Sequence, residues 1–287
     1  ESDNMSAVRM DGKALSAKVR GSILAETEEL KKKGVTPGLA VIIVGNDPAS
    51  EIYVRNKERA CEQCGFYSEK YALPEETMQE ELLGLIAQLN ESPQISGILC
   101  QMPVPKHISE QAVIDAIDPK RDVDAFHPVN VGKIMVGNFD FVPCTPAGVM
   151  ELLDEYKIDP KGKECVVVGR SNIVGKPMSM LLLHRHGTVT ICHSRTQNLA
   201  EVCRRADILV AAVGKAGFIT PDMVKDGAVV IDVGINRNAE GKVCGDVAPE
   251  VMEKASFMTP VPGGAGPMTI TMLMKNTLKA AKLQHNL

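Results

Sequence analysis

The sequence contains no tryptophan, and aromatic residues make up only 3% of it. Hydrophobic residues nevertheless reach 44%, so the cores must be built from Val, Ile, Leu, Met and Ala. This content is enough for full cores, and the length of 287 residues predicts two domains of ordinary size.

Long hydrophobic runs are also missing. No apolar run approaches the roughly 20 residues that a membrane-spanning helix needs, and the start shows no signal-peptide pattern. Met5 is a candidate natural start, so residues 1–4 are left out of the fold prediction. The formal net charge of -4 gives no electrostatic reason to expect nucleic acid as a partner. We expect no membrane or nucleic-acid partner, and a location in the cytoplasm or in an organelle entered with a cleaved leader.

The eight cysteines lack the spacing of a metal site. Cys61 and Cys64 form a C-x-x-C pair, but no second pair follows at a suitable spacing. Most of the others lie in apolar runs, where a free thiol acts as a small hydrophobic group. We expect no metal, and a reducing compartment.

Helix and strand patterns alternate along the whole chain. In the first half, helices are predicted at 11–33, 49–65, 77–90, 110–117 and 146–156, and strands at 39–45, 66–73 and 95–101. Residues 126–144 are predicted to be mostly loop. In the second half, strands are predicted at 164–169, 188–192, 207–212, 228–233 and 258–262, and a last helix at 267–284. Several of these strands are almost continuously apolar, which is typical of a parallel sheet that is covered on both faces. The apolar face of the last helix would allow it to pack back onto the first half.

A glycine turn follows the strand at 164–169. The apolar residues 166–168 end at Gly169, Gly175 follows six residues later, and a helical pattern begins near Pro177. Such a turn directs backbone N–H groups and a helix N-terminus at a phosphate. Because Ser171 replaces the middle glycine of the dinucleotide fingerprint, an ordinary turn without a ligand stays open.

The end of the next strand bears on the choice of nucleotide. An NAD site usually has an acidic residue there for the ribose hydroxyl, but none lies between His186 and Ala200. Ser194 and Arg195 occupy this place, and Arg170 lies in the glycine turn. Since a guanidinium can hold a 2′-phosphate through two hydrogen bonds, the sequence favours NADP.

Tyr53 and Lys57 lie four residues apart on a predicted helix, so their side chains share one face. Together they can form an acid/base pair, although an exposed helix face with these residues is also common. Short-chain dehydrogenases use the same spacing, but there the pair follows the cofactor loop. Here the pair precedes Gly169, which argues against that class.

Three further segments have the composition of binding sites. Gln101 ends a predicted strand, at the edge where open α/β sheets bind ligands. Asp122 and Asp124 lie in a loop that could meet N–H donors of a heterocycle, or could simply be solvated. Residues 260–269 hold three glycines and three prolines, which allow a ligand to approach the backbone closely.

Taken together, these motifs resemble the bifunctional methylenetetrahydrofolate dehydrogenase/methenyltetrahydrofolate cyclohydrolase family. The motifs that carry the resemblance are Tyr53-Val-Arg-Asn-Lys57, residues 97–105, Asp122-Val-Asp124, Gly169-Arg-Ser171 with Val174, Gly175 and Pro177, and residues 260–269. The resemblance implies NADP-linked oxidation of 5,10-methylenetetrahydrofolate to the methenyl form. It also implies hydrolysis of that form to 10-formyltetrahydrofolate in the same cleft, by a homodimer.

The resemblance also implies an α/β fold with two α/β domains, the second a Rossmann-like, doubly wound parallel sheet. A catalytic folate-binding domain would comprise residues 5–148 plus 267–287, and an NADP-binding domain residues 149–266. The catalytic residues implied are Lys57, Tyr53, Gln101 and Asp124. These four would also bind folate, together with Ser50, Pro262, Gly263, Gly264 and Gly266. The cofactor residues would be Gly169, Arg170, Ser171, Val174, Gly175, Pro177, Ser194, Arg195 and Ile235.

Two other functions stay open at this point. One is a member that keeps only the dehydrogenase, against which the presence of Lys57, Gln101 and Asp124 argues. The other is a non-catalytic NADP-binding protein, which would have no use for Lys57. Ala265 is smaller than the branched residue expected in its loop, but no functional group of the motifs is missing.

Overall fold

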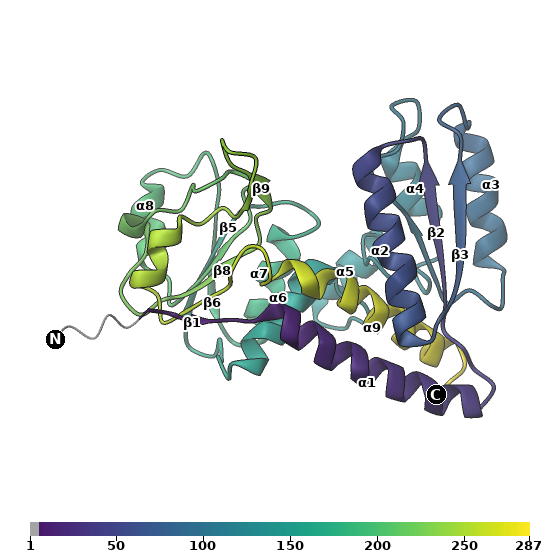
Figure 1. The fold of residues 1–287 in the computed structure, drawn as a ribbon, viewed down its shortest axis with the longest axis horizontal. Helices are drawn as coiled ribbons and strands as arrows, with labels where there is room; N and C mark the ends of the chain where they lie inside the picture. Colours follow the sequence, from purple (N-terminus) through teal and green to yellow (C-terminus); the bar gives the residue numbers. More distant parts are fainter. Residues whose placement is uncertain (1–5) are drawn as a thin grey trace. The chain divides into compact units, whose positions relative to one another are not determined.

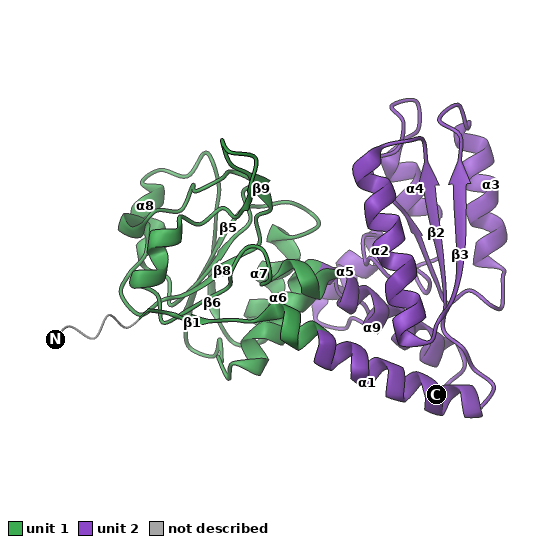
Figure 2. Cartoon of the chain, in the orientation of Figure 1, with its two compact units in different colours: residues 1–16, 145–269 green, residues 17–144, 270–287 purple. Residues whose placement is uncertain are grey.

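The computed structural model describes residues 6–287, so Met5, the candidate start, lies outside the described residues. The chain divides into two compact units (Figure 2). Unit 1 comprises the N-terminal residues up to Ser16 and residues 145–269, and unit 2 comprises residues 17–144 and 270–287. Both units are built from helices and a mainly parallel sheet, which confirms the predicted α/β class.

Within its described residues, unit 1 contains a six-stranded parallel sheet in the order β1-β11-β8-β7-β5-β6. Its strands are β1 (Val8–Arg9), β5 (Glu164–Val168), β6 (Thr188–Cys192), β7 (Ile208–Ala211), β8 (Val229–Asp232) and β11 (Phe257–Met258). Every residue of β7 and β8 is buried, because helices cover both faces of a doubly wound sheet. From β5 the chain adds β6 on one side and β7 on the other, so the topological switch point lies between β5 and β7.

Shorter elements connect these strands in unit 1. They are α6 (Cys144–Glu155), α7 (Gly175–His184), α8 (Leu199–Arg204), the 3-10 helices η1 (Pro221–Met223) and η2 (Pro249–Glu253), and the antiparallel strands β9 (Asn236–Arg237) and β10 (Val243–Cys244). Val166, Leu209 and Val230 from three neighbouring strands lie in the core of this unit.

Unit 2 contains a three-stranded parallel sheet in the order β3-β2-β4. Its strands are β2 (Gly38–Val44), β3 (Tyr67–Leu73) and β4 (Gly97–Cys100). The helices are α1 (Gly12–Lys32), whose first turn belongs to unit 1, α2 (Pro48–Cys64), α3 (Gln79–Asn90), α4 (Glu110–Ala116) and α5 (Pro128–Val136). All of β2 is buried, and Figure 1 shows α2 and α3 on the two sides of the sheet.

The C-terminal helix α9 (Gly266–Gln284) packs onto the N-terminal half of the chain from Ile270 onward, as predicted. The side-chain amide of Asn276 donates to the carbonyl oxygens of Val123, at 2.8 Å, and Val142, at 2.9 Å. Gln284 donates to the carbonyl of Ser96 at 2.9 Å. These bonds hold the loop around Val123 against the last helix.

The prediction of a loop over residues 126–144 is wrong for its first part, where α5 forms. His127 caps the helix by accepting from Val129 N–H through Nδ1 at 3.0 Å, and Pro128 occupies the first turn. Gly137 ends the helix with φ 79°. These are ordinary start and stop signals, but Gly132 inside the segment concealed them, because glycine usually indicates a break.

Candidate functional site

The start of α2 is set by its sequence, and Ser50 lies in the first turn of this helix. Asp47 caps the helix by accepting from the N–H of Ser50 at 3.1 Å and from its hydroxyl at 2.8 Å. Pro48 opens the first turn, and Gly65 ends the helix with φ 75°. Ser50 is buried, and its hydroxyl lies 3.5 Å from the carbonyl oxygen of Met102.

Lys57 and Gln101 meet although 44 residues separate them in the sequence. The Lys57 ammonium Nζ donates to Gln101 Oε1 at 2.6 Å, in a partly buried setting. Gln101 follows β4 directly, and its backbone N–H donates to the Ile42 carbonyl of the neighbouring strand at 2.8 Å. The sheet therefore holds the side-chain amide that orients the amine.

Asp124 is an unusual carboxylate in the same region of unit 2. Burial raises its pKa to about 6, with the negative charge of Asp122 adding to the rise and the Lys57 ammonium opposing it. The positive charge of Lys57 therefore acts on the Asp124 carboxyl group. A carboxyl group that titrates close to neutral pH next to an amine is typical of catalytic sites.

Asp122 holds the loop that carries Asp124. Its carboxylate accepts from the N–H of Phe126 at 3.3 Å, from the N–H of His127 at 2.8 Å and from the Asn130 amide at 2.8 Å. Burial raises the pKa of Asp122, and these hydrogen bonds oppose the rise. Asp122 is therefore buried inside its loop, which excludes the alternative that it is solvated.

Tyr53 lies one turn before Lys57 on α2, and this residue is 51% exposed. It is accessible for stacking against a flat ring. Cys61 and Cys64 lie buried in the last turns of the same helix, and burial raises the pKa of Cys61 to about 12 and that of Cys64 to about 11. Among residues 6–287, no group of three or more His, Cys, Asp or Glu side chains could hold a metal ion.

In unit 1, the glycine turn between β5 and α7 is tightly packed. Gly169 has φ 131°, and a Cβ added there would lie 2.4 Å from the carbonyl oxygen of Ala212. The hydroxyl of Ser171 accepts from Val174 N–H at 3.1 Å and from Gly175 N–H at 3.3 Å. Ser171, which departs from the three-glycine fingerprint, thus accepts from the N–H of Gly175, where α7 begins, and Pro177 is buried in the first turn of this helix.

Adding a methyl group at Gly175 is expected to disrupt this turn. An alanine Cβ would lie 2.3 Å from the carbonyl oxygen of Gly169, so Gly175→Ala should lower the free energy of unfolding by about 1–3 kcal/mol and weaken nucleotide binding. Urea denaturation and calorimetric titration with NADP measure both effects.

Gly84 provides the matched control, because it lies inside α3, is exposed and has open space around an added Cβ. Gly84→Ala should leave stability unchanged or raise it by up to about 1 kcal/mol. Wild-type stability and NADP affinity in Gly175→Ala would contradict the packing argument.

The other cofactor candidates lie at the carboxyl ends of neighbouring strands. Gly169 N–H donates to the Cys192 carbonyl at 2.8 Å, so the residues after β5 and β6 lie next to each other. Arg170, Ser194 and Arg195 are exposed there. Ile235, three residues after β8, is 65% exposed, and its Cδ1 lies 3.7 Å from a Cβ added at Gly266.

The loop of residues 260–266 is fixed by its glycines. Gly263 has φ 100°, and its carbonyl accepts from the N–H of Gly12 at 2.9 Å. A Cβ added at Gly264 would lie 2.4 Å from the Pro260 carbonyl oxygen. Pro262 and Gly266 are exposed on this loop, whereas Gly264 and Ala265 are buried.

The structure thus assembles the predicted residues in two sets, one in each unit. Unit 2 brings Lys57, Gln101 and Asp124 together, with Ser50 and Tyr53 on the same helix as Lys57. In unit 1 the cofactor candidates lie at the carboxyl ends of β5, β6 and β8, and Gly266 lies beside Ile235.

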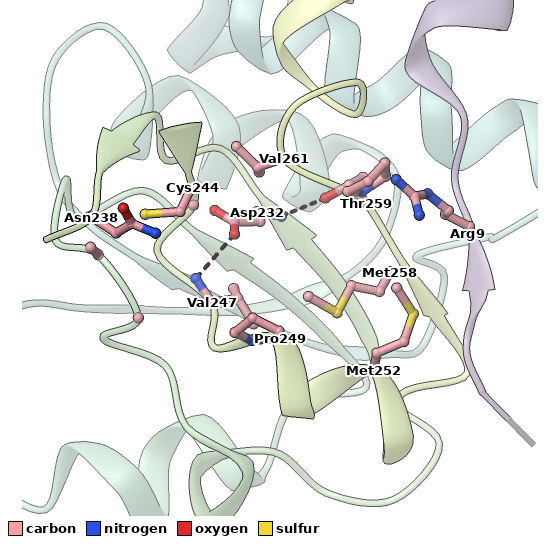
Figure 3. Close-up of a pocket in the computed structure, with 14 residues that line it drawn as sticks. Arg9, Asp232, Asn238, Cys244, Val247, Pro249, Met252, Met258, Thr259 and Val261 are labelled. Atoms are coloured by element: carbon pink, nitrogen blue, oxygen red, sulfur yellow. Dashed lines mark hydrogen bonds between the residues drawn. The ribbon is translucent and has the colours of Figure 1, made fainter. Parts of the chain in front are cut away.

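Sequence reasoning missed two buried aspartates of unit 1, Asp232 and Asp246. Asp232 N–H donates to the Thr259 hydroxyl at 2.8 Å, and its carboxylate accepts from Val247 N–H at 3.0 Å (Figure 3). For Asp232 the available signal was an acidic residue at the end of an apolar strand. Asp232 also lines a cavity of about 540 Å³ beside Arg9, Met252 and Met258.

Within the described residues, no helix is both long and apolar enough to cross a membrane. Two family descriptions match the chain: "Tetrahydrofolate dehydrogenase/cyclohydrolase, catalytic domain" over residues 10–124, and "Tetrahydrofolate dehydrogenase/cyclohydrolase, NAD(P)-binding domain" over residues 143–285.

Close relatives cover nearly the whole chain. "Bifunctional protein FolD" from Acetivibrio thermocellus is 65% identical over 281 residues, which are 98% of this chain and 99% of that protein. The bifunctional FolD enzyme of Campylobacter jejuni has a solved structure that is 48% identical, with a TM-score of 0.95, over 97% of this chain and 100% of that one. The Trypanosoma brucei enzyme, solved with NADP and an inhibitor, is 38% identical, with a TM-score of 0.92, over 98% and 99% of the two chains.

Proposed function

This chain belongs to the tetrahydrofolate dehydrogenase/cyclohydrolase family, and we propose that it catalyses both reactions of that name. It oxidises 5,10-methylenetetrahydrofolate to the 5,10-methenyl form with NADP, and it hydrolyses that form to 10-formyltetrahydrofolate. The 2.6 Å contact between Lys57 Nζ and Gln101 Oε1 carries the proposal, because it prepares an amine for proton transfer.

The residues of unit 1 fit a dinucleotide. Glycines at 169 and 175 allow the turn to pack closely, because a Cβ would lie 2.4 Å and 2.3 Å from backbone oxygens, and the N-terminus of α7 begins at Gly175. We assign Gly169, Ser171, Val174, Gly175 and Pro177 to the turn that faces the phosphates. We further assign Arg170, Ser194 and Arg195 to the 2′-phosphate, and Ile235 to the nicotinamide half. On this assignment residues 149–266 form the NADP-binding domain, and residues 5–148 with 267–287 the folate-binding domain. The compact units differ from these bounds near the N-terminus, because β1 pairs with β11 in the sheet of unit 1.

The oxidation depends mainly on positioning. When bound, NADP supplies the acceptor for the hydride that leaves the one-carbon bridge of the folate. The protein orients the folate beforehand, with Tyr53 stacking on the pterin ring and Asp124 accepting hydrogen bonds from its N–H groups. Ser50, Pro262, Gly263, Gly264 and Gly266 complete the proposed folate contacts.

The hydrolysis depends on proton transfer. The methenyl group is an amidinium-like cation, and water adds to its carbon while losing a proton. Lys57 accepts that proton as a neutral amine, and as the ammonium it gives the proton to the ring nitrogen whose bond to the carbon breaks, so one side chain serves as base and then as acid. Gln101 keeps the amine in place through its Oε1, and the sheet keeps Gln101 in place.

Two spectrophotometric assays test the function. NADPH formation from methylenetetrahydrofolate reports the oxidation, and loss of methenyl absorbance reports the hydrolysis. We expect both activities in one purified protein. Oxidation without hydrolysis above the buffer rate would identify a dehydrogenase-only enzyme, and neither activity with intact NADP binding would identify a non-catalytic binding protein.

The KM for the folate substrate is expected to rise as the pH falls through about 6, where the Asp124 carboxyl becomes protonated. Below its pKa this group gains a proton and loses the charge that attracts ring N–H donors. One pH unit lower, only about a tenth remains ionised, so KM should be about tenfold higher. Steady-state kinetics between pH 5 and 8 measure the profile. Asp124→Asn should show a high KM without this step, and the same step in that variant would refute the assignment.

A homodimer and a cytoplasmic location complete the proposal. Chromatography with light scattering tests the first, and cell fractionation tests the second.

A further inference from the structure

Asp246 is a fully buried carboxylate beneath an exposed loop of unit 1. It lies between β10 and η2, and its own carbonyl oxygen accepts from Ile219 N–H at 2.9 Å. The loop above it, residues 212–217, directly follows the end of β7, and its residues 214–217 are exposed. A buried charge in such a place requires partners.

The partners are three successive backbone N–H groups of that loop. Val213 donates to Oδ2 at 2.7 Å, Gly214 to Oδ2 at 3.1 Å, and Lys215 to Oδ1 at 3.0 Å. The Asn236 amide also donates to Oδ1, at 2.8 Å. Successive N–H groups that converge in this way form an anion-binding nest. Here the Asp246 carboxylate fills the nest. Because Asn236 also donates to it, this carboxylate joins the loop after β7 to the segment after β8.

Two glycines make this arrangement possible. A Cβ at Gly234 would lie 2.1 Å from Asp246 Oδ1, and a Cβ at Gly245 would lie 1.9 Å from Asp232 Oδ2. Asp232 in turn accepts from the N–H of Asp246 at 2.9 Å and of Gly234 at 3.0 Å. Each aspartate therefore packs against the glycine beside the other. Burial raises the pKa of Asp232 to about 6, and the negative charge of Asp246 contributes to the rise.

The position of the loop along the sheet indicates its role. At the carboxyl edge, Val168 of β5 pairs with Cys192 of β6 on one side and with Ala211 of β7 on the other. Asp232 of β8 then pairs with Ala211. A dinucleotide bound across this switch point with its 2′-phosphate at the end of β6 has its other half over β7 and β8. The loop held by Asp246 lies at that second half.

We propose that Asp246 is a positioning residue for the nicotinamide half of the cofactor, which it serves by fixing the loop of residues 213–215. This role rests on the proposed function for the identity of the cofactor. Asp246 itself is buried and acts only through the loop backbone.

Asp246→Asn tests the role, because an amide keeps the size of the side chain but loses its charge and replaces one accepting oxygen by an NH2 group, which cannot accept from the loop N–H groups. Calorimetric titrations compare NADP with adenosine 2′,5′-bisphosphate, which carries only the adenosine half. We expect NADP to bind about tenfold or more weakly, in line with lost charge-assisted hydrogen bonds. The bisphosphate affinity should stay within about twofold of wild type. The KM for NADP should rise while methenyl hydrolysis is retained.

Asp226→Asn is the matched control, because Asp226 is an exposed carboxylate of the same unit. This variant should change neither the two affinities nor the two activities.

Equal weakening of NADP and the bisphosphate would show general damage and overturn the proposal, as would an unchanged NADP affinity. If Asp246→Asn does not fold, Asn236→Ala removes a single donor to the carboxylate and should weaken NADP by about threefold without affecting the bisphosphate. An equal effect on both ligands, or none, would again overturn it. These outcomes differ from a failure of the proposed function. In that case the wild-type protein itself would lack oxidation or hydrolysis, whatever the ligand titrations show.

Discussion

Lys57→Met is expected to lower kcat for methenyl hydrolysis by at least about 100-fold while the fold stays intact, because general acid–base catalysis contributes about 10²–10⁴ to rate. Methionine has a similar length but carries no proton and cannot donate to Gln101 Oε1. NADP binding should be unchanged, since the cofactor candidates lie in the other unit. The loss of methenyl absorbance measures hydrolysis, and calorimetry measures cofactor binding.

Lys32→Met provides the control for charge and surface effects. Lys32 lies on α1 of the same unit, and its side chain is 72% exposed and paired with Glu29. Such exposed pairs contribute at most about 1 kcal/mol to stability, so this variant should hydrolyse at the wild-type rate. Hydrolysis that survives in Lys57→Met with a normal circular dichroism spectrum would remove Lys57 from the mechanism.

The elements that could be predicted from sequence are those with strong local signals. Helix α2 has a capping aspartate, a proline at its start and a glycine at its end, so both boundaries were visible. Strands β2, β7 and β8 are buried along their length and contain continuous apolar runs. Such continuous apolar runs are typical of strands that are covered on both faces.

The elements that were missed depend on distant partners. Strand β1 has only two residues, both exposed, and forms because it pairs with Phe257 and Met258 of β11. The two residues of β9 pair with β10, and α8 has only six residues. A periodic pattern cannot appear in so few positions, so tertiary contacts decide these structures.

The residues of the candidate site divide in the same way, into those with a local sequence signal and those that depend on distant partners. Gln101 could be predicted because ligands bind at the carboxyl ends of parallel strands, and the structure places its side chain on Lys57. Asp246 could not be predicted, because its partners at 213–215 lie about thirty residues earlier and are backbone N–H groups, which exist at every position except proline. A side chain whose partners are backbone N–H groups therefore has no recognisable residue pattern at its partner positions.

Arg170→Ala is expected to weaken NADP by about 10- to 100-fold and NAD by less than about threefold, which corresponds to the 1.5–3 kcal/mol of hydrogen bonds to a charged group. Arg170 follows Gly169 and is exposed, and Gly169 N–H bonds to the Cys192 carbonyl at 2.8 Å. This bond places Arg170 at the same edge as Ser194 and Arg195, where a 2′-phosphate would meet two guanidinium groups. NAD lacks the 2′-phosphate, so the two guanidinium groups add little to its affinity.

Arg205→Ala is the matched control for the loss of a positive charge. Arg205 is exposed after α8 and precedes β7, so it lies toward the amino ends of the strands, away from the cofactor edge. Calorimetric titration of both variants with NADP and NAD separates a local contact from long-range attraction. Long-range attraction would weaken NADP in both variants and would fade in high salt, because exposed charges are screened beyond about 10 Å. Equal losses for NADP and NAD in Arg170→Ala would mean that the arginine contacts the shared phosphates, and the 2′-phosphate assignment would then fall to Ser194 and Arg195 alone.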